Sequence, residues 1–278
     1  MSYPLLVHSE YSIQEAYGRI RPYVARAKEL GYPAIGLCDT HSLSGAVEFI
    51  QECKKQKFMG KPIIGVTFNV IFDFGIKGDL VIFARNREGY YWLCQMLGTS
   101  FLMDDAPYVE WSTIKKRISA DIVIVAKTEE VWRCIGTVAA YKYFLPENEV
   151  FYVLEEDKIL QQIIICAKFK TTLRNALGDI DEQKYIKFFT DKGFALQEKY
   201  GPCPIKDAIL GLVEPYDVAD NPHIPSFGVA NPNEELRKIC REGWKKKGLV
   251  EKLSSNDELK KVYSDRIKRE LDVFTGAN

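Results

Sequence analysis

The stretch PAIGLCDTHSLSGAVEFIQECKKQKFMGKPIIGVTFNV, which runs from Pro33 to Val70, decides the fold class. It opens with a short apolar strand at residues 34–38 that ends in Asp39. A polar turn then leads into a predicted helix at residues 43–56, and a second apolar strand follows at residues 63–72. A strand, a helix and a strand in this order form a β/α unit, which favours a parallel sheet.

The same alternation continues on both sides of this stretch. Compact apolar runs predict further strands at residues 79–85, 121–127 and 150–154. Helical spacing of apolar residues predicts helices at residues 13–30, interrupted at Pro22, and at residues 90–101, 111–118 and 131–143. Residues 159–167 contain three consecutive isoleucines and fit either a helix or a strand.

The composition changes after about residue 202. Six prolines occupy positions 202, 204, 215, 222, 225 and 232, which predicts a rigid, irregular connector rather than a packed element. Amphipathic helices are then expected at residues 233–248 and 259–274. We therefore expect an α/β domain at residues 1–222, followed by a connector and helices at residues 223–278.

Charge, cysteine content and hydrophobicity indicate which kinds of partner and cellular environment to expect. Among 278 residues, 38 Lys and Arg balance 38 Asp and Glu, so a broad basic surface for nucleic acid is not expected. The seven cysteines form no CxxC pair, which fits a reducing cytoplasm without disulfides. No apolar window reaches the length of a membrane span, and we expect a cytoplasmic protein that does not contact a membrane.

Segments at both ends of the chain resemble one known family. The N-terminal block comprises VHSEYS at residues 7–12, AKELG at 27–31, IGLCD at 35–39, GAVEF at 45–49 and KPIIGV at 61–66. The C-terminal block comprises IPSF at residues 224–227, EL at 235–236 and EL at 270–271. The N-terminal block resembles the PHP (polymerase and histidinol phosphatase) domain, in the version that opens the α subunit of bacterial DNA polymerase III. The C-terminal block resembles the bridge from that domain into the polymerase palm. Residues 130–220 match only loosely.

The resemblance implies a distorted (β/α)7, TIM-like barrel with a C-terminal proline-rich connector and helical extension. In that family the carboxyl ends of the strands hold up to three metal ions, which activate water for phosphoester hydrolysis. The extension would lead toward a polymerase palm, which is absent from this chain. By resemblance the chain is part of a DNA-directed DNA polymerase, a nucleotidyltransferase, and alone it is expected to be inactive.

Most of the family's metal ligands have no counterpart here. The opening His-x-His motif falls on Leu6-Val7-His8, and an Asp-His pair falls on Asp39-Thr40, so one ligand of each remains. The expected glutamate is Thr67, and the late Asp-x-His motif falls on residues 171–175, TTLRN, which supply no ligand.

Four vestigial candidates therefore remain: His8, Asp39, His41 and Asp79. His41 stands one place late for the motif, and Asp79 lies near the position of a family histidine. Two retained ligands bind a divalent ion only weakly, so we expect no metal cofactor, with Zn²⁺ or Mn²⁺ as the alternative. His8 and Asp39 are instead expected to form a hydrogen-bonded pair.

The preferred hypothesis is a non-catalytic PHP domain that acts in DNA replication as a structural scaffold and partner-binding module. Its expected partners are polymerase palm and thumb domains, in cis or in trans, and a proofreading exonuclease subunit, with DNA contacted only indirectly. The alternative is a metal-dependent phosphoesterase or 3′-5′ proofreading exonuclease with a rearranged site built from the four candidates.

Overall fold

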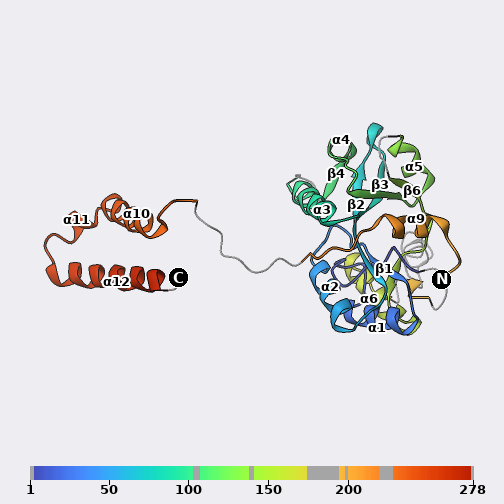
Figure 1. Ribbon diagram of the computed structural model, residues 1–278, viewed down its shortest axis with the longest axis horizontal. Coiled ribbons are helices and arrows are strands. Elements are labelled where there is room, and N and C mark those ends of the chain that lie inside the picture. Colours follow the sequence, from blue (N-terminus) through green and yellow to red (C-terminus); the bar gives the residue numbers. More distant parts are fainter. Residues whose placement is uncertain are drawn as a thin grey trace. The chain divides into compact units, whose positions relative to one another are not determined.

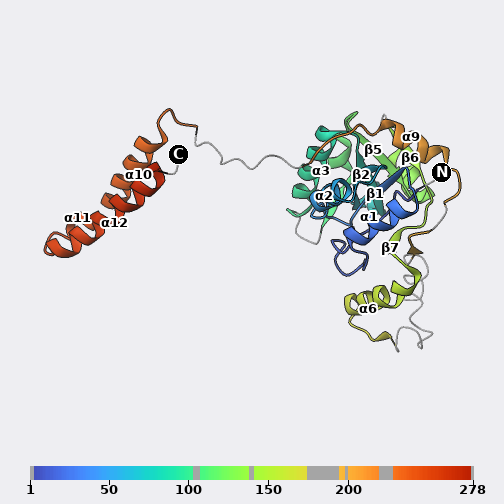
Figure 2. The same cartoon turned by 60° about the horizontal axis from the view of Figure 1, so that its bottom comes forward.

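The computed structural model describes residues 3–102, 107–137, 141–173, 194–197, 200–218 and 228–276. The chain divides into two compact units, Met1–Asp220 and Asn221–Asn278. The first unit has an α/β fold, and the described part of the second consists of helices (Figure 1 and Figure 2).

Strands and helices alternate along most of the first unit. The strands are β1 (Ala34–Leu37), β2 (Lys61–Ile71), β3 (Lys77–Ala84), β4 (Tyr108–Glu110), β5 (Ile122–Ala126), β6 (Lys142–Phe144), β7 (Val150–Tyr152) and β8 (Phe194–Ala195). The α-helices are α1 (Ile20–Glu29), α2 (Ala46–Lys55), α3 (Arg87–Ser100), α4 (Trp111–Lys115), α5 (Glu129–Ile135), α6 (Lys158–Lys168) and α9 (Pro204–Leu212). Short 3-10 turns are η1 (Asp73–Gly75) and η2 (Glu155–Asp157).

Six of these strands form one sheet and two form another. The larger sheet has the order β1-β2-β3-β5-β6, with β4 paired to β2, and β7 pairs with β8. The extended N-terminal segment joins the two sheets, because Gly36 N–H donates to the Pro4 carbonyl and His8 N–H donates to the Val150 carbonyl. The strands thus form an open run from β6 to β8, and no pairing between these end strands occurs within the described ranges.

The larger sheet is mixed, so the expectation of a parallel sheet is wrong for its centre. β3 runs antiparallel to both β2 and β5, whereas β1 pairs with β2 and β5 pairs with β6 in parallel. A short turn at η1 joins β2 to β3, with Phe74 at φ 62° and Gly75 at φ 75°. A connection this short cannot hold the crossover helix that parallel neighbours need, so β3 returns antiparallel.

Both faces of the larger sheet are buried. Successive side chains of a strand point to opposite faces, and alternate residues of β3 and β5 accordingly belong to two separate apolar cores. Val81 and Phe83 pack into the core that α1 and α2 cover, and Leu80 and Ile82 pack into the core that α3, α4 and α5 cover (Figure 1). Burial on both faces explains why β3 and β5 read as continuous apolar runs.

Two helical segments differ clearly in extent from the sequence expectation, and one ambiguous segment is resolved. Residues 13–15 form a turn, residues 16–19 have no regular secondary structure, and α1 begins only at Ile20. Pro22 lies in the first turn of α1, where a missing N–H costs little. α5 ends at Ile135 because Gly136 adopts φ 62°, and the chain then enters β6 instead of continuing as a helix to residue 143. Residues 159–167, which fit either structure, lie within helix α6.

The expectation of an irregular connector is wrong for residues 204–212, which form the packed helix α9. Pro204 occupies the first turn of this helix, a position that favours proline. Ile209 is fully buried in the core beneath the helix. Lys206 donates to the carbonyl of Tyr3 at 2.7 Å and forms a buried ion pair with Glu147. Helix α9 thus connects residues 204–212 to the N-terminal segment of the chain.

The second unit contains α10 (Pro232–Lys246), α11 (Leu249–Lys252) and α12 (Asp257–Gly276), close to the two helices expected from the sequence. The Asn231 side chain caps α10 by accepting a hydrogen bond from Glu234 N–H at 3.2 Å. Gly248, with φ 63°, separates α10 from α11. Trp244 contacts Tyr263 edge to face, with ring centroids 6.5 Å apart. Among the described residues of this unit only Leu253 is buried, so the unit has little core of its own.

Candidate functional site

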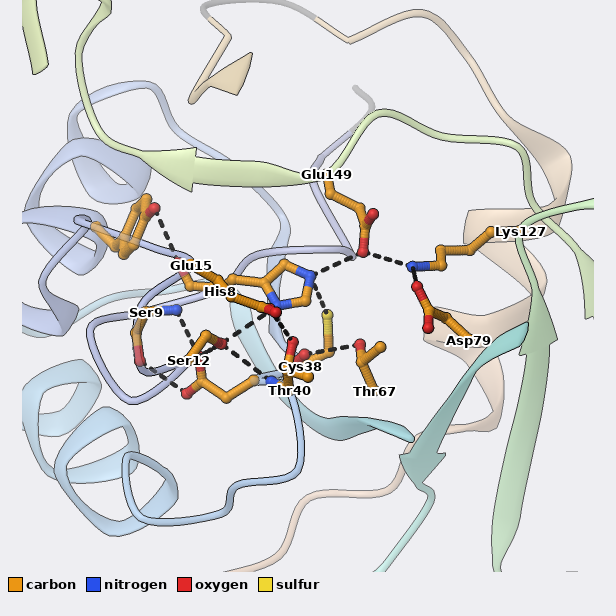
Figure 3. A network of polar contacts seen from close by, with 12 residues as sticks. His8, Ser9, Ser12, Glu15, Cys38, Thr40, Thr67, Asp79, Lys127 and Glu149 are labelled. Carbon is orange, nitrogen blue, oxygen red and sulfur yellow. Dashed lines mark hydrogen bonds and ion pairs between the residues drawn. The ribbon is translucent and has the colours of Figure 1, made fainter. Parts of the chain in front are cut away.

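A buried polar cluster lies at the edge of the larger sheet where β1 and β5 end (Figure 3). Asp39 follows β1 by two residues and Lys127 directly follows β5. These strands run in the same direction, because β1 is parallel to β2 and β3 is antiparallel to both β2 and β5. Their carboxyl ends therefore meet at one edge, where His8, at the end of the N-terminal extended segment, and Glu149, just before β7, complete the cluster.

The Asp39 carboxylate holds the loop at residues 8–12 in place. It accepts hydrogen bonds from Ser9 N–H at 2.5 Å, from Ser9 Oγ at 2.7 Å and from Ser12 Oγ at 2.7 Å. Burial raises the pKa of Asp39 above its ordinary value, although the hydrogen bonds from Ser9 and Ser12 and the charge of His8 oppose this rise. His8 Nδ1 lies 3.3 Å from Ser12 Oγ, so Ser12 links His8 to Asp39. This bridge replaces the direct pair expected from the sequence.

The other ring nitrogen of His8 begins a row of alternating charges. His8 Nε2 lies 2.9 Å from Glu149 Oε1, Glu149 Oε1 lies 2.6 Å from Lys127 Nζ, and Lys127 Nζ lies 3.5 Å from Asp79 Oδ2. Burial by itself lowers the pKa of His8, but the Cys38 sulfur and the Glu149 carboxylate outweigh it and raise this pKa to about 10. Burial likewise lowers the pKa of Lys127, and Glu149 and Asp79 outweigh it and raise this pKa. Both nitrogen groups are therefore cationic at neutral pH.

His41 is held apart from this row by the backbone of β2. Its Nε2 atom accepts a hydrogen bond from Asn69 N–H at 2.8 Å, and its ring meets the Phe68 ring edge to face. Burial lowers the pKa of His41 to about 4, although Asp79 and Glu15 oppose this shift. The ring is therefore neutral at pH 7, with its proton on Nδ1, because Nε2 acts as an acceptor.

A cavity of about 740 Å³ adjoins the cluster, and Glu15, Thr40, His41, Asn69 and Lys168 are among its lining residues. Glu15 accepts from Thr40 Oγ1 at 2.8 Å and pairs with Lys168 Nζ at 2.6 Å. The charges of this wall are thus paired with one another. Thr67, at the position of the expected glutamate, donates from Oγ1 to the Cys38 carbonyl at 2.9 Å.

The structure therefore joins three of the four sequence candidates into one network. His8 and Asp39 meet through Ser12, and Asp79 reaches His8 through Lys127 and Glu149, whereas His41 bonds to β2.

Sequence reasoning missed Lys127 and Glu149. Lys127 carries a signal that could have found it, because it is the first residue after a buried strand. Glu149 lies 141 residues from His8 in the chain, and no spacing connects the two.

The residues at this edge do not fit the metal cluster that the family resemblance implies. Asp39 already accepts three hydrogen bonds, His8 is cationic, and metal binding requires a neutral imidazole. The Lys127 ammonium stands between two carboxylates that would have to turn toward an ion. Across the described part of the chain, no three His, Cys, Asp or Glu side chains are grouped so that they could hold a metal ion. The last two positions of the stretch 171–175 lie outside the described residues.

Comparison with known protein families identifies the fold family. The family model described as PHP domain matches residues 4–196. This chain belongs to the PHP domain family. The match includes every residue of the cluster, from His8 to Glu149.

Similar proteins include α subunits of DNA polymerase III from several bacteria. The subunit of Ureaplasma parvum is 25% identical over 282 residues, covering 97% of this chain and 27% of the relative. That of Halalkalibacterium halodurans is 38% identical over 90 residues, covering 32% of this chain and 8% of the relative. That of Chlamydia trachomatis is 35% identical over 130 residues, covering 43% and 10%. The chain thus spans about a quarter or less of the length of these relatives.

Among solved structures, a proposed metal-dependent phosphoesterase from Bifidobacterium adolescentis is 10% identical, with a TM-score of 0.33, and covers 76% of this chain and 64% of that one. A similarity this low does not establish a shared mechanism. In the described ranges, no helix combines the length and the apolar character that crossing a membrane requires.

Proposed function

We propose that this chain is a non-catalytic PHP domain of a DNA polymerase III α-type subunit, acting in DNA replication as a structural scaffold and partner-binding module. The observation that carries this proposal is the buried network at the family's metal-binding edge. There the polar atoms of Asp39, His8 and Glu149 form hydrogen bonds and ion pairs with one another and with neighbouring residues. Such a network stabilises the fold but leaves no group free to activate water.

The similarity to polymerase α subunits supports the scaffold role. It extends over nearly the whole chain in the Ureaplasma parvum relative, including the second unit. That unit exposes apolar side chains on its helices, among them Ile239, Val262 and Phe274, which suits packing against a further domain. The proposed partners are polymerase palm and thumb domains, in cis or in trans, and a proofreading exonuclease subunit, all in the cytoplasm.

We also propose the finer architecture that the family implies. Residues 1–222 would form a distorted (β/α)7 barrel, and residues 223–278 a connector and helices leading toward the palm. The continuous run of strands from β6 through the N-terminal segment to β8 supports the barrel. The division of the chain into units at Asp220 supports the boundary.

Elemental analysis and a nuclease assay test the non-catalytic role. The purified chain, dialysed against Zn²⁺ or Mn²⁺ and then against buffer, should retain no stoichiometric metal and should not degrade a 3′-ended single strand. Stoichiometric metal, together with nuclease activity that His8→Ala abolishes, would establish the phosphoesterase instead.

A binding assay tests the scaffold role. The chain should co-elute in size-exclusion chromatography with a palm-and-thumb fragment of a DNA polymerase III α subunit from the same organism. Separate elution of the two polypeptides would contradict the scaffold role while leaving the non-catalytic reading standing.

A further inference from the structure

The side chain of Lys127 is buried among acidic and basic partners. Only 11% of it is exposed, and its ammonium lies 2.6 Å from Glu149 Oε1 and 3.5 Å from Asp79 Oδ2. Figure 3 shows the ammonium between the two carboxylates, on the far side of Glu149 from His8. Lysine is rarely buried unless it is paired, so this position has a specific electrostatic cause.

The Lys127 ammonium lies between two carboxylates, the buried one of Glu149 and that of Asp79, whose side chain is 31% exposed. Without a cation between them, their mutual repulsion and the burial of Glu149 would make the ionised forms costly, and the His8 cation offsets only the part of this cost that falls on Glu149. A metal ion is one solution, and the Lys127 ammonium is another, because it supplies positive charge from within the chain. The second solution also occupies the space: an incoming divalent ion would meet the ammonium at close range.

We propose that Lys127 is a built-in cation that substitutes for a divalent metal ion at this edge of the sheet and excludes such an ion from His8, Glu149 and Asp79. The inference rests on the proposed non-catalytic function and adds the physical device that maintains it. It implies that the edge keeps a latent cation site, which the ammonium blocks.

The donors of the latent site are identifiable from the contacts. His8 Nε2 lies 2.9 Å from Glu149 Oε1, and Cys38 Sγ lies 3.9 Å from the same nitrogen. Once the ammonium is removed, the Glu149 and Asp79 carboxylates each lose their ion pair with it, while Glu149 keeps its contact with His8. In the present arrangement of the described residues these side chains are not grouped so that they could hold a metal ion, so a Zn²⁺ site forms only when the carboxylates turn toward this nitrogen and sulfur. Nitrogen, sulfur and carboxylate oxygen would then suit Zn²⁺, which would displace the His8 proton as it binds.

Titration with Zn²⁺ alone tests the proposal, using isothermal calorimetry and thermal melting of the full chain. Lys127→Ala should gain one Zn²⁺ site, at least about tenfold tighter than any binding by the unsubstituted chain. Zn²⁺ should also raise the melting temperature of this variant. Lys127→Arg keeps the charge and should gain nothing. Lys168→Ala removes a lysine of the neighbouring Glu15 pair and is the matched control, also without gain. Adding His8→Ala to Lys127→Ala should abolish the gained site.

A second variant covers the case in which Lys127→Ala does not fold. Lys127→Gln keeps a donor for Glu149 and most of the side-chain volume, and removes only the charge, so it should also gain Zn²⁺ affinity. If the variants that fold bind Zn²⁺ no better than the unsubstituted chain, the built-in cation is refuted and the non-catalytic function stands. Stoichiometric Zn²⁺ on the unsubstituted chain would overturn both.

Discussion

Mild acid should destabilise this protein through His41. Burial lowers the pKa of His41 to about 4, against the opposing charges of Asp79 and Glu15. In the unfolded chain the same ring titrates near its ordinary pKa of about 6.5. Between these two values the unfolded state binds a proton that the folded state does not, so stability falls as the pH falls. The contribution of the neutral ring is fully present above about pH 6.5 and is lost progressively toward pH 4.

The size of the effect follows from the width of this window. One pKa unit corresponds to about 1.4 kcal/mol, so the window from about 6.5 to about 4 is worth roughly 3 kcal/mol. About 2 kcal/mol of this should already be lost at pH 5, because the unfolded ring is then almost fully protonated. Against a total stability of about 5–15 kcal/mol, a loss of this size is readily measured.

Urea unfolding at pH 7, 6 and 5, followed by tryptophan fluorescence, measures the effect, with His41→Asn as the reference. Asparagine tolerates the left-handed backbone of this position, where φ is 48°, and does not titrate. The carboxylates of the protein titrate in both chains, so their contribution largely cancels in the difference. The unsubstituted chain should lose about 2 kcal/mol more than the variant between pH 7 and pH 5.

Equal losses in the two chains would refute the reasoning, because His41 would then have the same pKa folded and unfolded. A smaller loss in the unsubstituted chain would reverse the sign and show that the folded state binds the proton more tightly.

Three substitutions test the packing around the site by thermal or urea unfolding. Gly36→Ala should lower the free energy of unfolding by about 1–3 kcal/mol, because a Cβ there would lie 2.3 Å from a backbone carbonyl oxygen of the N-terminal segment. The control Gly98→Ala meets no atom within 4 Å and should be neutral or stabilising. Equal effects of the two substitutions would contradict the close approach at Gly36. Ile209→Ala should lower the free energy of unfolding by roughly 2–5 kcal/mol, because Ile209 is fully buried beneath α9. A loss under about 0.5 kcal/mol would mean that this segment is a loosely packed connector. Lys206→Ala leaves the buried Glu147 carboxylate without its ion pair and should lower the free energy of unfolding by roughly 3–5 kcal/mol. Lys54→Ala breaks an exposed ion pair and should lower it by at most about 1 kcal/mol. Similar losses for both variants would mean that burial does not determine how much these ion pairs stabilise the fold.

Much of the secondary structure was predictable from local pattern. The strands β1, β3 and β5 and the helices α2 and α3 lie where apolar runs and helical spacing placed them, within a few residues. Errors arose where a single backbone conformation ended an element, as at Gly136, or where a sequence cue had two meanings, as for Pro204 at the start of α9. Proline breaks a helix interior but suits a first turn, and composition alone does not distinguish the two.

The amino-acid sequence by itself determined the family and predicted that most of its metal ligands are missing, because motif residues such as His8 and Asp39, and the threonine at position 67, are read directly from the chain. Only the tertiary structure decided which side chains gather at this edge of the sheet. The mixed sheet brings the carboxyl ends of β1 and β5 to one edge, and the approach of β7 adds Glu149 beside Lys127. Contacts between residues so far apart depend on which strands pair and in which direction, and no local spacing encodes that.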